Sequence, residues 1–254
     1  GQKLKETHSE MLDRLQMALT LATAGPCFLW QARQVRRRVP QLSECFLAQG
    51  QRAGSGPPIR LGFIGDSIMA GIGHTEVEGT LVGHLTRLLA EKTGRGVEWH
   101  NLAHNGSCSQ SLLQLLPADL PQVDLWIVSV GVNDALRLRN PQVYGQNLAR
   151  LAERSPNVPW LWVGLPNLND FPCIPYPLRS FLAWRVSKLE STALSLPQPW
   201  RSFQLKTRHT LDTFSPDLFH PGALGCRIWA EKLLPTLFQI LGLREKIVSL
   251  RVIV

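Results

Sequence analysis

The sequence predicts an α/β fold built on a parallel sheet that helices cover on both faces. From residue 59 onward, apolar runs of strand length alternate with amphipathic helical patterns. The apolar runs are nearly continuous, which is typical of parallel strands buried on both faces. The chain has 254 residues, 44% of them apolar, which is enough for one good-sized domain with a substantial core.

The predicted elements follow one another in a regular order. Five runs are expected to form strands: residues 59–64, 97–102, 123–130, 160–165 and 200–205. Apolar residues at helical spacing predict helices over residues 77–92, 109–116, 143–153, 178–194 and 223–241. We therefore expect a mainly parallel five-stranded sheet in a domain spanning residues 57–254, with residues 247–254 forming either an edge strand or a tail. Ligands of such sheets bind beyond the carboxyl ends of the strands.

Residues 1–56 are predicted to form an arm and a linker. Residues 11–30 have apolar residues at helical spacing with a break at Gly25-Pro26, four arginines follow within residues 33–38, and residues 50–58 are rich in Gly, Ser and Pro. Residues 11–38 could lie peripherally on an anionic membrane surface. Alternatively, the arm packs on the domain and its basic end is solvated.

The net charge of +8 lies mainly in this arm, since residues 1–60 hold nine basic and four acidic residues. No basic stripe interleaved with aromatics occurs elsewhere, which argues against nucleic acid as a partner. No apolar stretch suits a polytopic membrane protein. Acidic residues ahead of the apolar run disfavour a secretory signal, so we expect a cytoplasmic location, at the inner face of the membrane if the arm binds it. An extracytoplasmic location stays open.

The five cysteines indicate neither a disulfide framework nor a zinc site, because they are odd in number and include no C-x-x-C pair.

A serine follows the first predicted strand, in the sequence Gly65-Asp66-Ser67. At the carboxyl edge of a parallel strand, a serine hydroxyl can face a substrate while neighbouring backbone N–H groups bind an oxyanion. The chain contains no G-x-S-x-G, so the nucleophile elbow of the α/β-hydrolases is not the model. Gly-Asp-Ser alone is short enough to arise by chance.

Candidate oxyanion donors follow the second and third predicted strands. The N–H of Gly106 could point at developing negative charge, although a glycine here also suits a tight strand-to-helix turn. Asn133 follows the third strand, and its side-chain amide could donate to the same oxyanion. Alternatively, Asn133 forms an Asx turn or caps the next helix.

A candidate general base precedes the last predicted helix. His220 could deprotonate Ser67, and Asp217, three residues earlier, could hold the imidazole by its other nitrogen. The alternative for Asp217 is a capping role. The remaining histidines lack such a partner and are expected at the surface or on helix faces: His8, His74, His84, His100, His104 and His209.

Taken together and in this order, the four blocks resemble the SGNH hydrolases, also called the GDSL esterase/lipase family, over residues 61–223. The resemblance implies a flavodoxin-like, three-layer α/β/α fold. It implies a carboxylic ester hydrolase that uses no metal or organic cofactor. Asp66 and Asp134 would be structural and tie the first and third loops together. The arm is similar to the lead-in of some bacterial lysophospholipase-like members.

The resemblance also assigns roles to the candidate residues. Ser67 would be the nucleophile, and its own N–H, the N–H of Gly106 and the side chain of Asn133 would form the oxyanion hole. His220 would act first as base and then as acid, and Asp217 would orient it.

The loop at residues 166–178 is the candidate substrate wall. Its four prolines and the apolar Phe171, Ile174 and Leu178 would form a stiff surface suited to an acyl chain, with Tyr176 adding a polar contact. An ordinary packed connection is the alternative.

We expect hydrolysis of short to medium acyl esters, from a small-molecule or lipid substrate, with lysophospholipids included if the arm meets a membrane. The alternatives are a carbohydrate O-deacetylase with the same residues, a thioesterase, and a noncatalytic membrane-associated protein that has kept the fold. The oligomeric state stays open.

Overall fold

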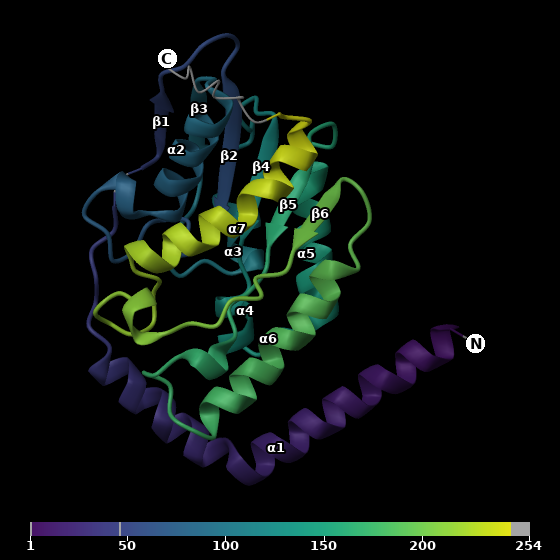
Figure 1. The fold of residues 1–254 in the computed structure, drawn as a ribbon. Helices are drawn as coiled ribbons and strands as arrows, with labels where there is room; N and C mark the ends of the chain where they lie inside the picture. Colours follow the sequence, from purple (N-terminus) through teal and green to yellow (C-terminus); the bar gives the residue numbers. More distant parts are fainter. Residues whose placement is uncertain (1, 46, 245–254) are drawn as a thin grey trace, which may run out of the picture.

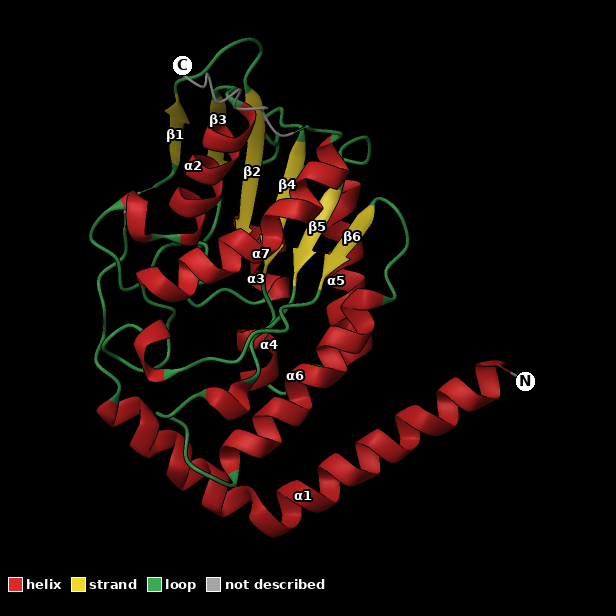
Figure 2. Ribbon diagram, in the orientation of Figure 1, coloured by secondary structure: helices red, strands yellow, loops and turns green. Residues whose placement is uncertain are grey.

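The computed structural model describes residues 2–45 and 47–244 and has a central sheet between two layers of helices (Figures 1 and 2). The sheet order is β1-β3-β2-β4-β5-β6. The strands are β1 Gln49–Arg52, β2 Ile59–Gly65, β3 Val97–Asn101, β4 Leu125–Ser129, β5 Trp160–Val163 and β6 Trp200–Phe203. β2 to β6 are parallel, and β1 pairs antiparallel with β3. The three-layer fold and the five predicted strands are confirmed. Residues 247–254 lie outside the described residues.

Helices cover both faces of the sheet (Figure 1). They are α1 Gln2–Arg38, α2 Leu81–Thr93, α3 Ser109–Leu115, α4 Val132–Leu136, α5 Pro141–Glu153, α6 Leu178–Leu194 and α7 Ala223–Leu241, with short 3-10 helices η1 Val77–Gly79, η2 Leu168–Asp170 and η3 Leu211–Thr213. α2 and α7 pack on one face, and α3, α5 and α6 pack on the other. The five predicted helices are present, and the short α4 is an addition.

Side chains of the central strands alternate between two cores. Trp126 and Trp160 belong to the core on the α5 and α6 side, whereas Ile127 and Leu161 belong to the core under α2 and α7. Trp126, Trp160 and Trp200 stand at matching positions of β4, β5 and β6, and neighbouring ring centroids are 5.5 Å apart. A slip of one residue would turn an indole to the opposite face, so this row fixes the register of three strands.

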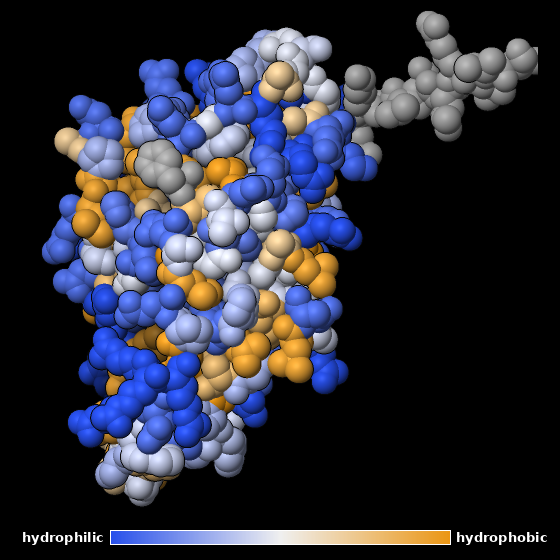
Figure 3. All heavy atoms as spheres, turned by 90° about the vertical axis from the view of Figure 1, so that its left-hand side faces the viewer, coloured by the Kyte–Doolittle hydropathy of each residue, from blue (hydrophilic) through white to orange (hydrophobic). Residues whose placement is uncertain are grey.

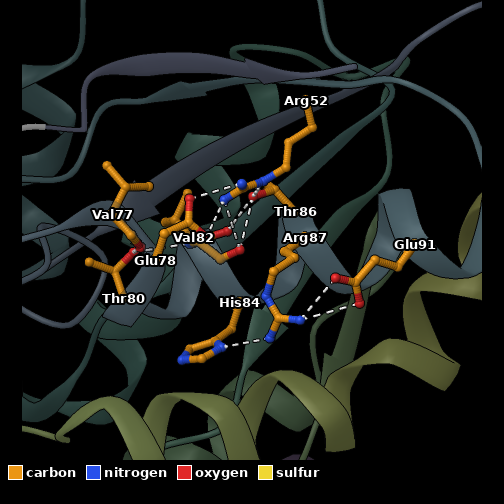
Figure 4. A network of polar contacts seen from close by, with 10 residues as sticks. Arg52, Val77, Glu78, Thr80, Val82, His84, Thr86, Arg87 and Glu91 are labelled. Atoms are coloured by element: carbon orange, nitrogen blue, oxygen red, sulfur yellow. Dashed lines mark hydrogen bonds and ion pairs between the residues drawn. The ribbon is translucent and has the colours of Figure 1, made fainter. Parts of the chain in front are cut away.

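The sheet has six strands, so the prediction of five strands was wrong, because it missed the edge strand β1. This strand lies in the segment expected to be arm and linker, and its sequence has no apolar residue. A side chain at Gly50 would meet the ring of Trp99 in β3 at 2.1 Å, so glycine allows the two strands to pair. Arg52 then binds both carboxylate oxygens of Glu78 at 2.9 and 3.1 Å and the hydroxyl of Thr86 at 3.2 Å (Figure 4). These contacts tie β1 to η1 and α2.

The arm forms the helix α1, which is longer than the sequence predicted. It continues through Pro26 to Arg38, bends near its middle and extends past the body of the domain at its N-terminal end (Figure 1). Phe28 stacks on Phe181 of α6 with ring centroids 4.8 Å apart, and Asp13 pairs with Lys188 at 2.8 Å. α1 therefore packs on the domain along one side. Of the described helices, none has the length and apolarity needed to cross a membrane.

Candidate active site

Ser67 lies in a tight turn at the carboxyl end of β2. Asp66 N–H donates to Ser129 O of β4 at 3.0 Å, and Ile72 N–H donates to Ser67 O at 3.1 Å. Gly65 is needed at the base of this turn, because a side chain there would meet Ser129 O at 2.3 Å. Ser67 N–H donates to none of the residues that the structure describes. The amide of Ser67 is therefore available to bind a ligand.

Gly106 and Asn133 each offer a further donor. Gly106 has a φ of +73°, the left-handed region that favours glycine, and its N–H has no acceptor within the described part of the chain. Its carbonyl accepts from Arg137 Nη2 at 3.2 Å, which holds the peptide in place. Asn133 Nδ2 donates to Ser107 O at 3.0 Å, and the second hydrogen of this amide is left for a ligand.

His220 and Asp217 form a hydrogen-bonded pair. Asp217 Oδ2 lies 2.6 Å from His220 Nδ1, while Asp217 Oδ1 accepts the backbone N–H groups of Phe219 and His220, each at 3.0 Å. Leu218 between them has a φ of +57°, which is rare for a side chain of this kind and turns the chain back on itself.

The carboxylate of Asp217 fixes the state of the imidazole. Burial acts to raise the pKa of Asp217, but the hydrogen bonds from the His220 ring and from two backbone N–H groups together hold it below its usual value. A charged Asp217 favours the tautomer of His220 that carries hydrogen on Nδ1. Nε2 is then the nitrogen that can accept a proton.

Two buried histidines support this region, so the expectation that they lie at the surface or on helix faces was wrong. His74 is 7% exposed, and its Nε2 donates to Pro221 O at 3.1 Å, directly after His220. Burial lowers the pKa of His74, so it stays neutral near pH 7. His209 is 8% exposed and packs edge-on against Trp229, with ring centroids 5.5 Å apart. Neither histidine stands in a recognisable motif.

Asp134 ties different loops together from those expected. Its carboxylate accepts the N–H and the hydroxyl of Ser109 at 2.8 and 2.6 Å and pairs with Arg139 at 2.8 Å. It therefore joins the loop after β4 to the start of α3, in the second block. The first and third loops are joined instead by the backbone N–H of Asp66, which donates to Ser129 O at the end of β4.

Asp66 is a buried acid beside the nucleophile. It is 2% exposed, and its carboxylate accepts one long hydrogen bond of 3.3 Å, from Ile68 N–H. Burial raises its pKa to about 7, because so few contacts compensate the desolvation of the charge.

One cavity of about 180 Å³ brings the candidate residues together. It is lined by Ser67, Gly106, Asn133 and His220, and by the aromatic rings of Phe171, Phe214, Phe219 and Trp229. No hydrogen bond joins Ser67 Oγ to His220 within the described residues, and in ligand-free sites such bonds are often long and tighten on substrate binding. The described residues contain no cluster of three His, Cys, Asp or Glu side chains that could hold a metal.

The predicted substrate wall is divided between two places. Phe171 lines the cavity, whereas Ile174 and Leu178 line a neighbouring groove that also contacts His220. Tyr176 is 72% exposed and lines neither of them. The loop therefore contributes apolar side chains at both positions but not the expected polar contact.

A family model for the GDSL-like lipase/acylhydrolase family matches residues 63–228. This chain belongs to that family. The SGNH resemblance is thereby confirmed, and the chain is a carboxylic ester hydrolase. α1 and β1 precede the matched residues. No curated protein sequence matches the chain.

Solved structures of esterases share the fold. TesA is 27% identical, with 71% of this chain and 99% of that chain covered and a TM-score of 0.52. Axe2, an acetylxylan esterase from Geobacillus stearothermophilus, is 19% identical, with 75% and 96% covered and a TM-score of 0.51. A carbohydrate acetylesterase family member from Sinorhizobium meliloti is 18% identical, with 73% and 100% covered and a TM-score of 0.52.

Proposed function

We propose that this chain hydrolyses esters of short to medium acyl groups through an acyl-enzyme on Ser67. The observation that carries the proposal is the single cavity shared by Ser67, His220 and the donors of Gly106 and Asn133, with His220 held by Asp217. A binding protein has no need of a nucleophile, an oriented base and free oxyanion donors around one small space.

The first step forms the acyl-enzyme. Ser67 Oγ attacks the ester carbonyl as His220 Nε2 takes its proton, and the carbonyl oxygen becomes an oxyanion. The N–H groups of Ser67 and Gly106 and the free hydrogen of Asn133 bind this oxyanion. His220 then gives the proton to the departing alcohol oxygen as the carbon–oxygen bond breaks.

The second step releases the acid. Water enters, His220 takes one of its protons, and the resulting hydroxide attacks the acyl carbonyl. The bond to Ser67 Oγ breaks, and His220 returns the proton to Ser67. Throughout, the negative charge of Asp217 stabilises the protonated imidazole.

The volume of the cavity limits the acyl group. At about 180 Å³ the cavity is smaller than the roughly 300–1,000 Å³ of pockets that enclose a drug-sized ligand. The lining rings of Phe171, Phe214 and Trp229 offer an apolar surface. This space therefore suits short to medium acyl groups rather than long chains.

The test is a series of p-nitrophenyl esters from acetate to palmitate, with wild type and the Ser67→Ala and Ser55→Ala variants. Ser55 is an exposed serine in the linker before β2, whereas Ser67 follows the opposite end of that strand, so Ser55 serves as the matched control. We expect wild type and Ser55→Ala to prefer the short esters, and Ser67→Ala to lose about a thousandfold or more in kcat. Full activity of Ser67→Ala, or a preference for palmitate, would contradict the proposal.

A carbohydrate O-deacetylase is the second candidate, because the cavity also admits an acetyl group and two of the similar folds are named for acetylated carbohydrates. Acetylated xylan and p-nitrophenyl butyrate separate the two activities. A deacetylase would release acetate from xylan and ignore butyrate. We expect the opposite result, because the groove beside His220 is lined mainly by aliphatic side chains.

We also propose that α1 rests on an anionic membrane surface, at the inner face of the cytoplasmic membrane. Successive residues of a helix are turned by about 100°, and on this basis the exposed large apolar side chains of α1 fall within an arc of about 100° around the helix axis. They are Met11, Leu12, Leu15, Leu19, Leu29 and Trp30. Arg33 and Arg37 are exposed on the same side. Hydrophilic side chains gather over the lower part of the face in Figure 3, the end of the molecule where α1 terminates in Figure 1.

An apolar stripe next to a tryptophan and arginines suits the headgroup region of an anionic bilayer. The test is sedimentation with vesicles of phosphatidylcholine, with and without phosphatidylglycerol, using Leu15→Asp and the control Leu211→Asp. Leu15 and Leu211 are similarly exposed, at 65% and 68%. We expect binding that needs the anionic lipid and is lost only in Leu15→Asp. Equal binding of all three proteins, or dimers that Leu15→Asp dissociates without any vesicle binding, would refute the membrane contact.

A further inference from the structure

A second, larger space opens beside the catalytic cavity. This groove has a volume of about 840 Å³ and shares Asn105, Phe219 and His220 with the cavity. One wall comes from the end of α1, through Ala32, Val35 and Arg36, which lie on one face of the helix, and from Val39 directly after it. The facing wall comes from the substrate loop and α6, through Ile174, Leu178 and Leu182.

The groove lies on the leaving-group side of the site. Ser67 and Asn133 line the cavity and not the groove, whereas His220 lines both. During acyl transfer the base stands between the nucleophile and the leaving group, because it takes the proton from one and gives it to the other. The acyl group therefore belongs with the oxyanion donors in the cavity, and the alcohol leaves past His220 into the groove.

Two arginines give the groove a positive charge. Arg36 is exposed on α1 and has no ion-pair or hydrogen-bond partner within the described part of the chain. The guanidinium of Arg137 donates to Cys108 Sγ at 2.9 Å and to Gly106 O at 3.2 Å, and it forms no ion pair with a carboxylate in the described part of the chain. The one carboxylate that lines the groove, Asp217, is buried and bound to His220.

We propose that this groove binds the alcohol portion of the substrate, and that this alcohol is an amphiphile carrying an anionic group such as a carboxylate or a phosphate. The aliphatic walls take its apolar part, and Arg36 and Arg137 take its charge. The inference rests on the proposed esterase activity and names the substrate class of the same site.

α1 is fixed firmly enough to serve as a wall of the site. Gln31 Nε2 donates to Tyr176 O at 2.7 Å, and Gln31 Oε1 accepts Leu178 N–H at 3.1 Å, so one side chain of α1 holds the C-terminal end of the substrate loop at two points. α1 precedes the residues that match the family model. Substrate choice in this chain thus depends on a helix outside the matched region.

The test compares two butyrate esters, one of hydroxyoctanoate and one of the corresponding uncharged hydroxyoctanamide. We expect wild type to prefer the anionic ester by about tenfold in kcat/KM, the effect of one hydrogen bond to a charged group. Arg36→Gln should lose most of this preference, and Arg36→Lys should keep part of it. Arg150→Gln removes an exposed positive charge from α5, at a residue that lines neither the groove nor the cavity, and should behave as wild type with both esters. Wild type and Arg150→Gln should hydrolyse p-nitrophenyl butyrate equally.

The outcomes separate this inference from the esterase proposal. Ser67-dependent hydrolysis of p-nitrophenyl butyrate without any preference for the anionic ester would overturn the groove assignment alone. An equal fall for both esters in Arg36→Gln would show a structural role and would also overturn it, as would faster cleavage of long-chain acyl esters of methanol. Absence of any Ser67-dependent ester hydrolysis would instead remove the esterase proposal.

Discussion

Replacing the buried carboxyl of Asp66 by an amide should change how the stability of the protein depends on pH. Asp66 is 2% exposed, and burial raises its pKa to about 7 from an ordinary value of 3.8. Because its pKa is higher in the folded state, Asp66 binds a proton there that the unfolded chain has already released. Its contribution to stability is therefore complete below the ordinary value of 3.8 and is lost as the pH rises through about 7.

The size of the effect follows from linkage. One pKa unit corresponds to about 1.4 kcal/mol, so between pH 5 and pH 8 the wild type should lose about 3 kcal/mol relative to Asp66→Asn, which stays neutral throughout. Other buried titratable groups affect both proteins alike and cancel in this comparison.

The assay is urea unfolding of both proteins at the two pH values, followed by the fluorescence of the buried tryptophans. Asp119→Asn, a substitution at an exposed aspartate, is the control and should track the wild type. A free-energy difference between wild type and Asp66→Asn that is the same at pH 5 and pH 8 would refute the assignment of a proton to Asp66.

Three further substitutions test the contacts around the site. Asp217→Asn should lower kcat on p-nitrophenyl butyrate by about 10³- to 10⁴-fold, because the Nδ1 hydrogen of His220 loses its acceptor; a loss below tenfold would contradict this. Asn133→Ala should lower kcat by about 10²- to 10³-fold with a smaller change in KM, and a change confined to KM would remove it from the oxyanion hole. Gln31→Ala should lower the free energy of unfolding by about 1–3 kcal/mol, since the N–H of Leu178 loses its acceptor; unchanged urea unfolding would count against the tie.

The position of the site could be predicted because parallel strands bring their carboxyl ends to one edge of the sheet. Gly65-Asp66-Ser67, Gly106 and Asn133 each follow a strand that the apolar pattern reveals, so their convergence follows from the fold. The pairing of Asp217 with His220 is local in sequence, which made it visible without a structure.

Features that depend on distant contacts were hidden from the sequence. β1 contains Gln49-Gly50-Gln51-Arg52 and has no apolar pattern, and its place in the sheet depends on Trp99 packing against Gly50. The ring of His74 donates a hydrogen bond to the carbonyl of Pro221, which lies 147 residues further along the sequence. Proximity of this kind arises only when the backbone is folded.

The groove was hidden for the same reason. Arg36 and Leu178 line the groove together although they lie far apart in the sequence. From the sequence alone, the arginines before residue 40 indicated only a basic cluster and not a place in the site. The apolar pattern predicted a helix only over residues 11–30, whereas α1 continues to Arg38 and so brings Arg36 to the groove.

The nucleophilic role of Ser67 is tested most directly by covalent trapping with a fluorophosphonate, followed by mass spectrometry of the peptides. We expect one modified peptide, with the adduct on Ser67, no labelling of Ser67→Ala, and slower labelling of Asp217→Asn. Butyrate esters should slow the labelling of Ser67, because they compete with the fluorophosphonate for the same site. An adduct on another residue, or undiminished labelling of Ser67→Ala, would contradict the assignment of Ser67 as the residue that carries the acyl group.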